Sequence, residues 1–180
     1  MNNRYPSYRG FKPSNVHSSA NKKMVKSTNT KAEIILRRSL RKAGLRFCMN
    51  DQSLPGKPDL SFPRYKVVVF CDGDFWHGRD WPKLRRKLMN RANSVYWIAK
   101  VIANRRRDIA VNHHLLKMGW IVIRIWETDI LSDIESVSSS LLLFIIKGKL
   151  NNTSHIRVFT RIGPKKKLQT TAKIKRSLIK

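Results

Sequence analysis

Acidic residues are scarce in this sequence. Its 180 residues include 11 Asp and Glu against 38 Lys and Arg, a formal net charge of +27. This imbalance predicts a polyanionic partner, most commonly nucleic acid. All 11 acids lie between Glu33 and Glu135, so both ends of the chain are purely basic. Carboxylates retained in a DNA-binding surface typically hold a metal ion or fix an arginine.

Cysteines and long hydrophobic runs are also few. Cys48 and Cys71 are too few for a disulfide framework and lack zinc-site spacing, which favours a reducing cytoplasm. The very apolar run Leu141 to Ile146 is too short to span a bilayer, and no secretory signal is visible at Met1. We therefore expect a cytoplasmic protein that does not associate with membranes.

Composition divides the chain into three parts. Residues 1–27 are rich in Ser, Asn, Lys and Arg, and we expect a mostly disordered basic arm that contacts phosphates. Residues 28–148 have the hydrophobic content of one folded domain. Residues 149–180 contain ten Lys or Arg and no acid, which predicts a basic flexible tail that attracts DNA without sequence preference.

Hydrophobic periodicity within residues 28–148 predicts a layered α/β domain. Thr30 and Glu33 form a capping box that begins a helix, and Gly44 ends it. Strands are expected at 45–50, 59–62, 65–71 and 120–126, a partly helical basic stretch at 79–93, and a last helix that includes 141–146. On a long helix at 94–118, one apolar face is expected to be buried with Asp108 at its edge; this face comprises Ile98, Ile102, Arg105, Ile109 and Leu116.

The segment from Asn50 to His77 contains the residues best suited to chemistry. Asp59 begins a predicted strand and can face the backbone carbonyl of Cys71 across a hairpin, a ligand pair that Mg²⁺ accepts. An aspartate near a turn is more often a turn residue, so this pair alone leaves both interpretations open. His77 has an imidazole suited to proton transfer near neutral pH.

Two aromatic residues, Phe75 and Trp76, lie in the loop that ends at His77. Such a pair is usually part of a core. Its position in a polar loop favours instead insertion between DNA bases, as apolar side chains do when proteins unstack and kink a duplex.

Four segments, taken in order, closely resemble the very short patch repair (Vsr) endonucleases. They are DQSLPGKPD, FCDGDFWHG, the N-x-x-R-D segment from Asn104 to Asp108, and GWxVxxxWE from Gly119 to Glu127. Vsr enzymes are bacterial nucleases of the PD-(D/E)XK superfamily that nick DNA beside a T:G mismatch left by deamination of 5-methylcytosine. The resemblance implies a restriction-endonuclease-like three-layer core, with a central mixed sheet flanked by helices. It also implies Mg²⁺-dependent nicking of double-stranded DNA, with 5′-phosphate and 3′-hydroxyl ends, in a bacterial or phage cytoplasm near the nucleoid.

The resemblance also implies roles for individual residues. Asp59 and the Cys71 carbonyl would bind the metal, and Glu33 would hold metal-bound water. The catalytic histidine would be His77, with Asp108 as its carboxylate partner. The expected DNA contacts are Phe75 and Trp76 inserted at the mismatch, Met24 as a wedge from the opposite groove, and Lys57 near the backbone.

The sequence departs from the family pattern at two places. Well-studied members have a histidine at the position of Asp72. An acid could ligate a hard cation such as Mg²⁺ there, so the catalytic role of Asp72 stays open. They also hold a structural zinc where this chain has Asp74, Arg79 and Thr128. We therefore predict no structural zinc, and expect residues 81–93 to be organised by packing alone.

Three functional classes remain in competition. The first is a monomeric mismatch-nicking endonuclease with one or two Mg²⁺ ions, linked to a cytosine methyltransferase or to mismatch-repair proteins. The second is a restriction-like or homing-type endonuclease that uses the same core on another DNA target. The third is a non-catalytic basic nucleic-acid-binding protein, which would leave the acids and His77 unexplained because carboxylates weaken affinity for a polyanion.

Overall fold

The computed structural model describes residues 28–147 and 156–159. The expectations for Met24, for the N-terminal arm and for most of the C-terminal tail concern residues outside these ranges. No helix in the described part of the chain combines the length and the apolar character needed to cross a membrane.

Five strands form one mixed sheet in the order β1-β2-β3-β4-β5. β1, β2 and β3 pair antiparallel, β3 and β4 pair parallel, and β5 pairs antiparallel with β4. The strands are β1 (Cys48–Met49), β2 (Leu60–Phe62), β3 (Val67–Asp72), β4 (Ile121–Trp126) and β5 (Ile156–Phe159). The helices are α2 (Lys31–Lys42), α3 (Trp81–Met89), α4 (Ser94–Lys117), α5 (Glu127–Ser132) and α6 (Ile134–Lys147), with a 3-10 turn η1 at Pro63–Tyr65.

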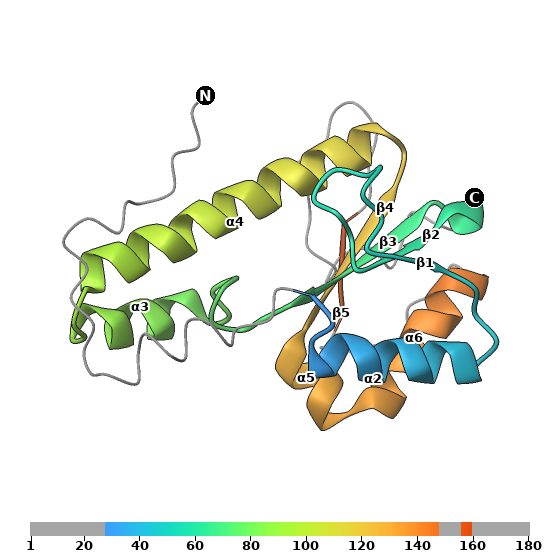
Figure 1. The fold of residues 1–180 in the computed structure, drawn as a ribbon, viewed down its shortest axis with the longest axis horizontal. Helices are drawn as coiled ribbons and strands as arrows, with labels where there is room; N and C mark the ends of the chain where they lie inside the picture. The colour runs from blue at the N-terminus through green and yellow to red at the C-terminus, as the bar shows by residue number, and fades with distance from the viewer. Residues whose placement is uncertain (1–27, 148–155, 160–180) are drawn as a thin grey trace.

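Helices cover both faces of the sheet, which confirms the predicted three-layer α/β core. α4 crosses one face, and α2, α5 and α6 cover the other (Figure 1). Alternate residues of β3 and β4 supply the two cores, because successive side chains of a strand point to opposite faces. Ile123 and Ile125 pack toward α2 and α6, whereas Val122 and Phe70 pack toward α4.

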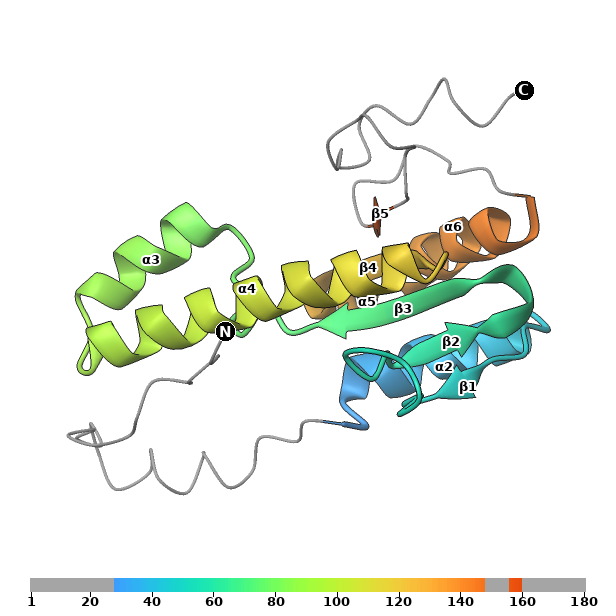
Figure 2. The ribbon, with the colours of Figure 1, turned by 90° about the horizontal axis from the view of Figure 1, so that it is seen from above.

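The crossover from β3 to β4 contains both α3 and α4. The C-terminal part of α4 packs on the sheet through Leu115 and Leu116, while its N-terminal part extends beyond the sheet with α3 beside it (Figure 2). Four exposed basic residues and no acid lie on α3: Lys83, Arg85, Arg86 and Lys87.

The buried face of α4 differs from the one that hydropathy predicted. Ile109 is 65% exposed, and the fully or nearly buried residues of the helix include Val101, Asn104 and Asn112. The two asparagines are buried because each makes a hydrogen bond within the fold: Asn104 Nδ2 donates to the Trp76 carbonyl, and Asn112 Oδ1 accepts from Arg124. Part of the inward face of α4 is therefore polar. The sequence prediction placed apolar residues inward, so it selected the neighbouring face.

Three other elements correct the sequence expectations. The first strand is only two residues long, and Asp133 divides the last helix into α5 and α6. Within the segment expected to be a flexible tail, Ile156–Phe159 adds β5 to the edge of β4. Such pairing joins residues about thirty positions apart, and local sequence does not specify it.

Candidate active site

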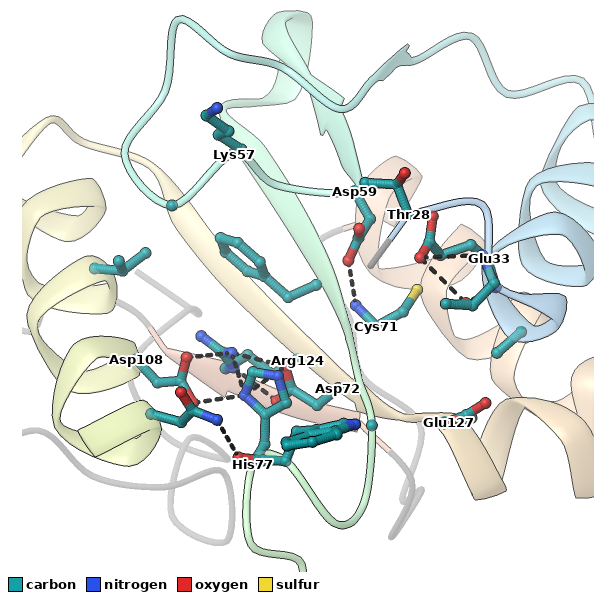
Figure 3. Close-up of a pocket in the computed structure, with 18 of the residues that line it drawn as sticks. Thr28, Glu33, Lys57, Asp59, Cys71, Asp72, His77, Asp108, Arg124 and Glu127 are labelled. Atoms are coloured by element: carbon teal, nitrogen blue, oxygen red, sulfur yellow. Dashed lines mark hydrogen bonds and ion pairs between the residues drawn. The ribbon is translucent and has the colours of Figure 1, made fainter. Parts of the chain in front are cut away.

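The parallel strands β3 and β4 end side by side, with Asp72 opposite Trp126 in the register. The loops that follow such strands open at the same edge of a sheet, where α/β proteins commonly place their sites. A cleft of about 850 Å³ lies there. All five residues predicted to be catalytic line it, as Figure 3 shows: Glu33, Asp59, Asp72, His77 and Asp108.

Asp59 lies immediately before β2, on one wall of this cleft. Its Oδ2 accepts a hydrogen bond of 2.7 Å from the backbone N–H of Cys71. Burial raises the pKa of Asp59 to about 7; the bond from Cys71 lowers it, and the charges of Glu33 and Asp72 raise it further. A carboxylate in this position is therefore under-neutralised and suited to a bound cation.

The expected metal ligands at this wall are the Asp59 carboxylate and the Cys71 carbonyl. The structure places the Cys71 amide, rather than its carbonyl, against Asp59. Among the described residues, no three His, Cys, Asp or Glu side chains form a group that could hold a metal. One carboxylate, one carbonyl and water make a sufficient set for Mg²⁺, so the metal site stays a prediction.

Glu33 both caps α2 and lines the cleft. Thr30 and Glu33 make the predicted capping box, and Glu33 Oε2 lies 2.6 Å from Nη2 of Arg37 one helical turn later. The carboxylate is only 3% exposed. Its capping role and its place beside Asp59 are therefore compatible, and the role in catalysis stays a prediction.

His77 and Asp108 form a close pair on the opposite wall. His77 Nδ1 lies 2.7 Å from Oδ2 of Asp108. Burial raises the pKa of Asp108, but the hydrogen bond to His77 and the charge of Arg124 outweigh it and lower the pKa overall. The carboxylate is thus ionised and must accept, so Nδ1 donates and Nε2 of a neutral His77 keeps its lone pair.

The loop that presents His77 is tied to α4 through its backbone. Asn104 Nδ2 donates to the Trp76 carbonyl at 2.9 Å, and Arg105 Nη1 donates to the Gly78 carbonyl at 3.0 Å. Gly78 has φ of +68°, and a Cβ there would lie 3.0 Å from Cγ1 of Val101. Glycine is therefore required where the loop turns against the helix.

Arg124 is a site residue that the sequence analysis missed. It is 3% exposed, and its Nε and Nη2 donate to the two carboxylate oxygens of Asp72, both at 2.7 Å. Nη2 lies 2.9 Å from Oδ1 of Asp108, Nη1 donates to Asn112 at 3.1 Å, and the guanidinium lies over the Phe70 ring. A lone arginine in the otherwise apolar strand Ile121–Trp126 was the available signal, because a buried charge requires a carboxylate partner.

A second polar network joins the loop that contains Phe75, Trp76 and His77, here called the FWH loop, to α5. Arg79 Nη1 lies 3.1 Å from Asp74, Nη2 lies 2.6 Å from the buried Asp129, and Thr128 donates to Asp74 through its hydroxyl and backbone N–H. Arg79 also lies over the Trp126 ring. The three positions where zinc was predicted to be absent are thus linked by hydrogen bonds, and the entry to α3 is not organised by packing alone.

Three of the predicted DNA-contact residues lie at the cleft or beside it, and the fourth, Met24, lies outside the described residues. Trp76 and Lys57 line the cleft, and Lys57 is exposed. Phe75 and Trp76 are half-buried and pack against Trp97 of α4, with ring centroids 5.7 and 6.0 Å from it. A rigid aromatic group therefore borders the site, while its insertion into DNA stays a prediction.

A mixed sheet between helical layers, with ionisable residues at the open ends of its parallel strands, places the protein among restriction-endonuclease-like nucleases. The sequence model of the DNA mismatch endonuclease Vsr matches residues 12–83. The type II nicking enzyme V.HpaIIP of Haemophilus parainfluenzae is 44% identical over 113 residues, which cover 63% of this chain and 79% of that relative. The DNA mismatch endonuclease Vsr of Escherichia coli is 31% identical over 109 residues, 61% of this chain and 68% of the relative.

The chain therefore belongs to the Vsr family and is an endodeoxyribonuclease. This membership removes the non-catalytic binding protein from the three functional classes. DNA is the substrate. The acidic residues, which a DNA-binding protein would leave unexplained, are expected in an enzyme.

Proposed function

We propose that this endonuclease nicks one strand of duplex DNA at a T:G mismatch, in a reaction that depends on Mg²⁺. The single observation that carries the chemistry is the meeting, in one cleft, of the half-buried Asp59 carboxylate and the His77–Asp108 pair. The mismatch preference rests on the family resemblance and on the aromatic group at the cleft edge.

The donor set at Asp59 fits a hard divalent cation. Its carboxylate has a pKa of about 7 without one, because burial and nearby acids disfavour its charge. Asp59 and the Cys71 carbonyl would hold the ion, with Glu33 beside it. When bound, one or two Mg²⁺ ions supply Lewis-acid stabilisation of the negative charge that develops on the phosphate.

Residues of the chain carry out the proton transfer. His77 Nε2 takes a proton from the attacking water, while Asp108 holds Nδ1–H and stabilises the imidazolium that forms. Water bonds to phosphorus, the bond from phosphorus to the 3′ oxygen breaks, and that oxygen takes a proton from solvent. The products are a 5′-phosphate and a 3′-hydroxyl.

Recognition is assigned to residues around the cleft. Lys57, which lines the cleft, would meet the DNA backbone. Phe75 and Trp76 would enter the duplex at the mismatch, with Met24 as a wedge from the opposite groove. Each aromatic ring that stacks on a base contributes about 1–3 kcal/mol to binding. Monomeric action, a cytoplasmic location and a link to a cytosine methyltransferase or to mismatch-repair proteins complete the proposal.

A second candidate is nicking of another DNA target. It is favoured by the names of several relatives, which are called type II nicking enzymes. A restriction-like or homing-type role would use the same cleft with a different recognition surface.

The test is nicking of a labelled duplex with one T:G mismatch beside its matched twin, with Mg²⁺ or EDTA, by the wild type and by Asp59→Ala. We expect Mg²⁺-dependent nicking of the mismatched duplex alone, lost in the variant. Equal cutting of both duplexes would favour the second candidate. Nicking that persists in EDTA or in Asp59→Ala would contradict the proposed chemistry.

A further inference from the structure

Arg124 is a deeply buried cation on the α4 side of the sheet that the proposed reaction does not use. Its neighbours lie on two other elements: Asp72 on β3, and Asp108 and Asn112 on α4. In the register of the parallel strands, Arg124 lies opposite Phe70, so its side chain crosses the Phe70 ring to reach Asp72 on the same sheet face. One guanidinium thereby joins the strand that leads into the FWH loop to the helix that holds the partner of His77.

We propose that Arg124 is a positioning residue for His77, acting through Asp108, and that Asp72 serves to hold Arg124 and does not contact the reacting atoms. This inference rests on the proposed role of His77 as the proton acceptor. It assigns Asp72, whose role the sequence left open, to the support of the His77–Asp108 pair.

The geometry at Asp72 supports this assignment. Both of its oxygens accept from Arg124 at 2.7 Å, and the residue is 1% exposed. A bidentate guanidinium–carboxylate pair of this kind is strong and directional. His77 Nδ1 lies 3.6 Å from Asp72 but 2.7 Å from Asp108, so Asp108 is the acceptor and Asp72 is engaged by the arginine.

The geometry at Asp108 supplies the second step. Its Oδ2 contacts His77 and its Oδ1 contacts Arg124, so the two oxygens are fixed by different partners. A carboxylate held at one oxygen cannot rotate away from the imidazole at the other. Removal of the guanidinium would leave Asp72 and Asp108 as neighbouring carboxylates without their shared cation, and both would compete for Nδ1.

The charges that face His77 come from every element around it. Asp72 lies on β3, Asp108 and Arg107 on α4 and Arg124 on β4, while Asp59, Lys57, Glu33 and Glu127 line the same cleft. Nη2 of Arg124 lies 3.4 Å from Nδ1 of His77. Loss of this positive charge favours protonated His77, so the His77 titration in Arg124→Met should move to higher pH.

The experiment compares Arg124→Met, Asp72→Asn and the double variant with Ile125→Ala as a matched control. Ile125 is the next residue of β4, is fully buried, and faces the opposite core. Its truncation lowers stability without touching the network. Single-turnover nicking, DNA affinity in EDTA and the ¹⁵N titration of His77 in EDTA are measured for each protein.

We expect Arg124→Met to lower the nicking rate roughly 100-fold, as loss of an oriented general base does, with DNA affinity within about threefold. Its His77 midpoint should rise, and that of Ile125→Ala should not move. The double variant should nick at least as fast as Arg124→Met, because the added Asp72→Asn change removes the carboxylate that would otherwise lack its cation. Arg124→Lys should recover part of the rate.

Two outcomes would overturn the inference. One is an unchanged His77 midpoint in Arg124→Met. The other is a further loss in the double variant equal to that of Asp72→Asn alone, which would give Asp72 an independent catalytic role. The titration needs no DNA, so it decides on Arg124 even if the wild type nicks neither duplex and the proposed function fails. Should Arg124→Met not fold, Arg124→Gln, which removes the charge but can still donate to Asp72, takes its place in the same comparison.

Discussion

The two walls of the cleft differ in how their carboxylates are neutralised. On the wall of β4 and α4, Asp72 and Asp108 share the guanidinium of Arg124, and the pKa of Asp108 is lowered despite its burial. On the other wall, Asp59 accepts one backbone hydrogen bond and has a pKa of about 7. On the first wall, called the complete wall below, side chains of the protein itself neutralise both carboxylates. On the second, incomplete wall, the charged form of Asp59 is disfavoured until a cation binds, as is expected of a metal site.

The largest expected effect comes from Asp59→Asn, which removes the charge from the incomplete wall. Because the folded pKa is raised from 3.8 to about 7, the native state binds more protons than the unfolded chain between these values. The free energy of unfolding of the wild type in EDTA therefore falls as pH rises from 4 to 7, by up to about 4 kcal/mol. Above pH 7 the variant should be more stable than the wild type, while nicking falls by roughly 1,000-fold or more.

Urea unfolding in EDTA across pH 4 to 8 measures this effect, and Mg²⁺ added in place of EDTA should stabilise the wild type but not Asp59→Asn. Asp51→Asn is the control, because hydrogen bonds from Ser53 and Ser61 lower the pKa of Asp51 against a small opposing effect of burial. Its contribution has the opposite sign: it is present at neutral pH and lost as pH falls below the ordinary value. The same pH dependence in Asp59→Asn and wild type would contradict the assignment.

The next effect tests the complete wall. In Asp108→Asn an amide replaces the acceptor of the His77 Nδ1–H, and its NH₂ can donate to Nδ1, which favours the wrong tautomer. Nicking should fall by roughly 100-fold to 10,000-fold with little change in stability or DNA affinity. Asp133→Asn is the control, since Asp133 accepts a hydrogen bond from the Ser136 backbone N–H away from the cleft. Equal losses in the two variants would show that the effect is not specific to His77.

The sequence predicted residues whose signal is local. Thr30 and Glu33 are three positions apart, so the capping box followed from neighbouring residues, and Asp59 and His77 lie in short motifs bounded by turns. That these residues share one site was implied only by the family resemblance. Arg124 could not be placed in this way, because its partners Asp72 and Asn112 lie 52 and 12 residues before it. Its buried charge in an apolar strand was visible, but the identity of the partner depended on the parallel register of β3 and β4.

The same limit explains the misplaced face of α4. Hydropathy selects apolar residues, whereas this helix buries Asn104 and Asn112 because the FWH loop and Arg124 satisfy their side chains. Those partners become visible only once the sheet is assembled. Sequence periodicity therefore located the helix correctly and oriented it incorrectly, at the place where the fold builds its site.

A smaller effect is expected at the ion pairs that join the FWH loop to α5. Arg79→Met removes the ion pairs with Asp74 and Asp129, and we expect a loss of about 1 kcal/mol because Arg79 is 36% exposed and its charge is partly screened. Thermal unfolding measures the loss, with Arg85→Met on the exposed face of α3 as the control. A zinc-selective chelator should leave the wild-type Tm unchanged, and a marked drop would contradict the predicted absence of structural zinc.

The smallest effect concerns the approach of DNA to the cleft. Lys57 and Lys66 are both exposed and have φ of +51° and +52°, so replacement by Gln imposes the same backbone demand at each. Lys57 lines the cleft, whereas Lys66 precedes β3 at its other end and lies over Trp120. Lys57→Gln should weaken DNA binding about threefold to tenfold at low salt and reduce the slope of log K against log salt by about one. Lys66→Gln should leave both unchanged, and identical slopes in the two variants would place the DNA backbone elsewhere.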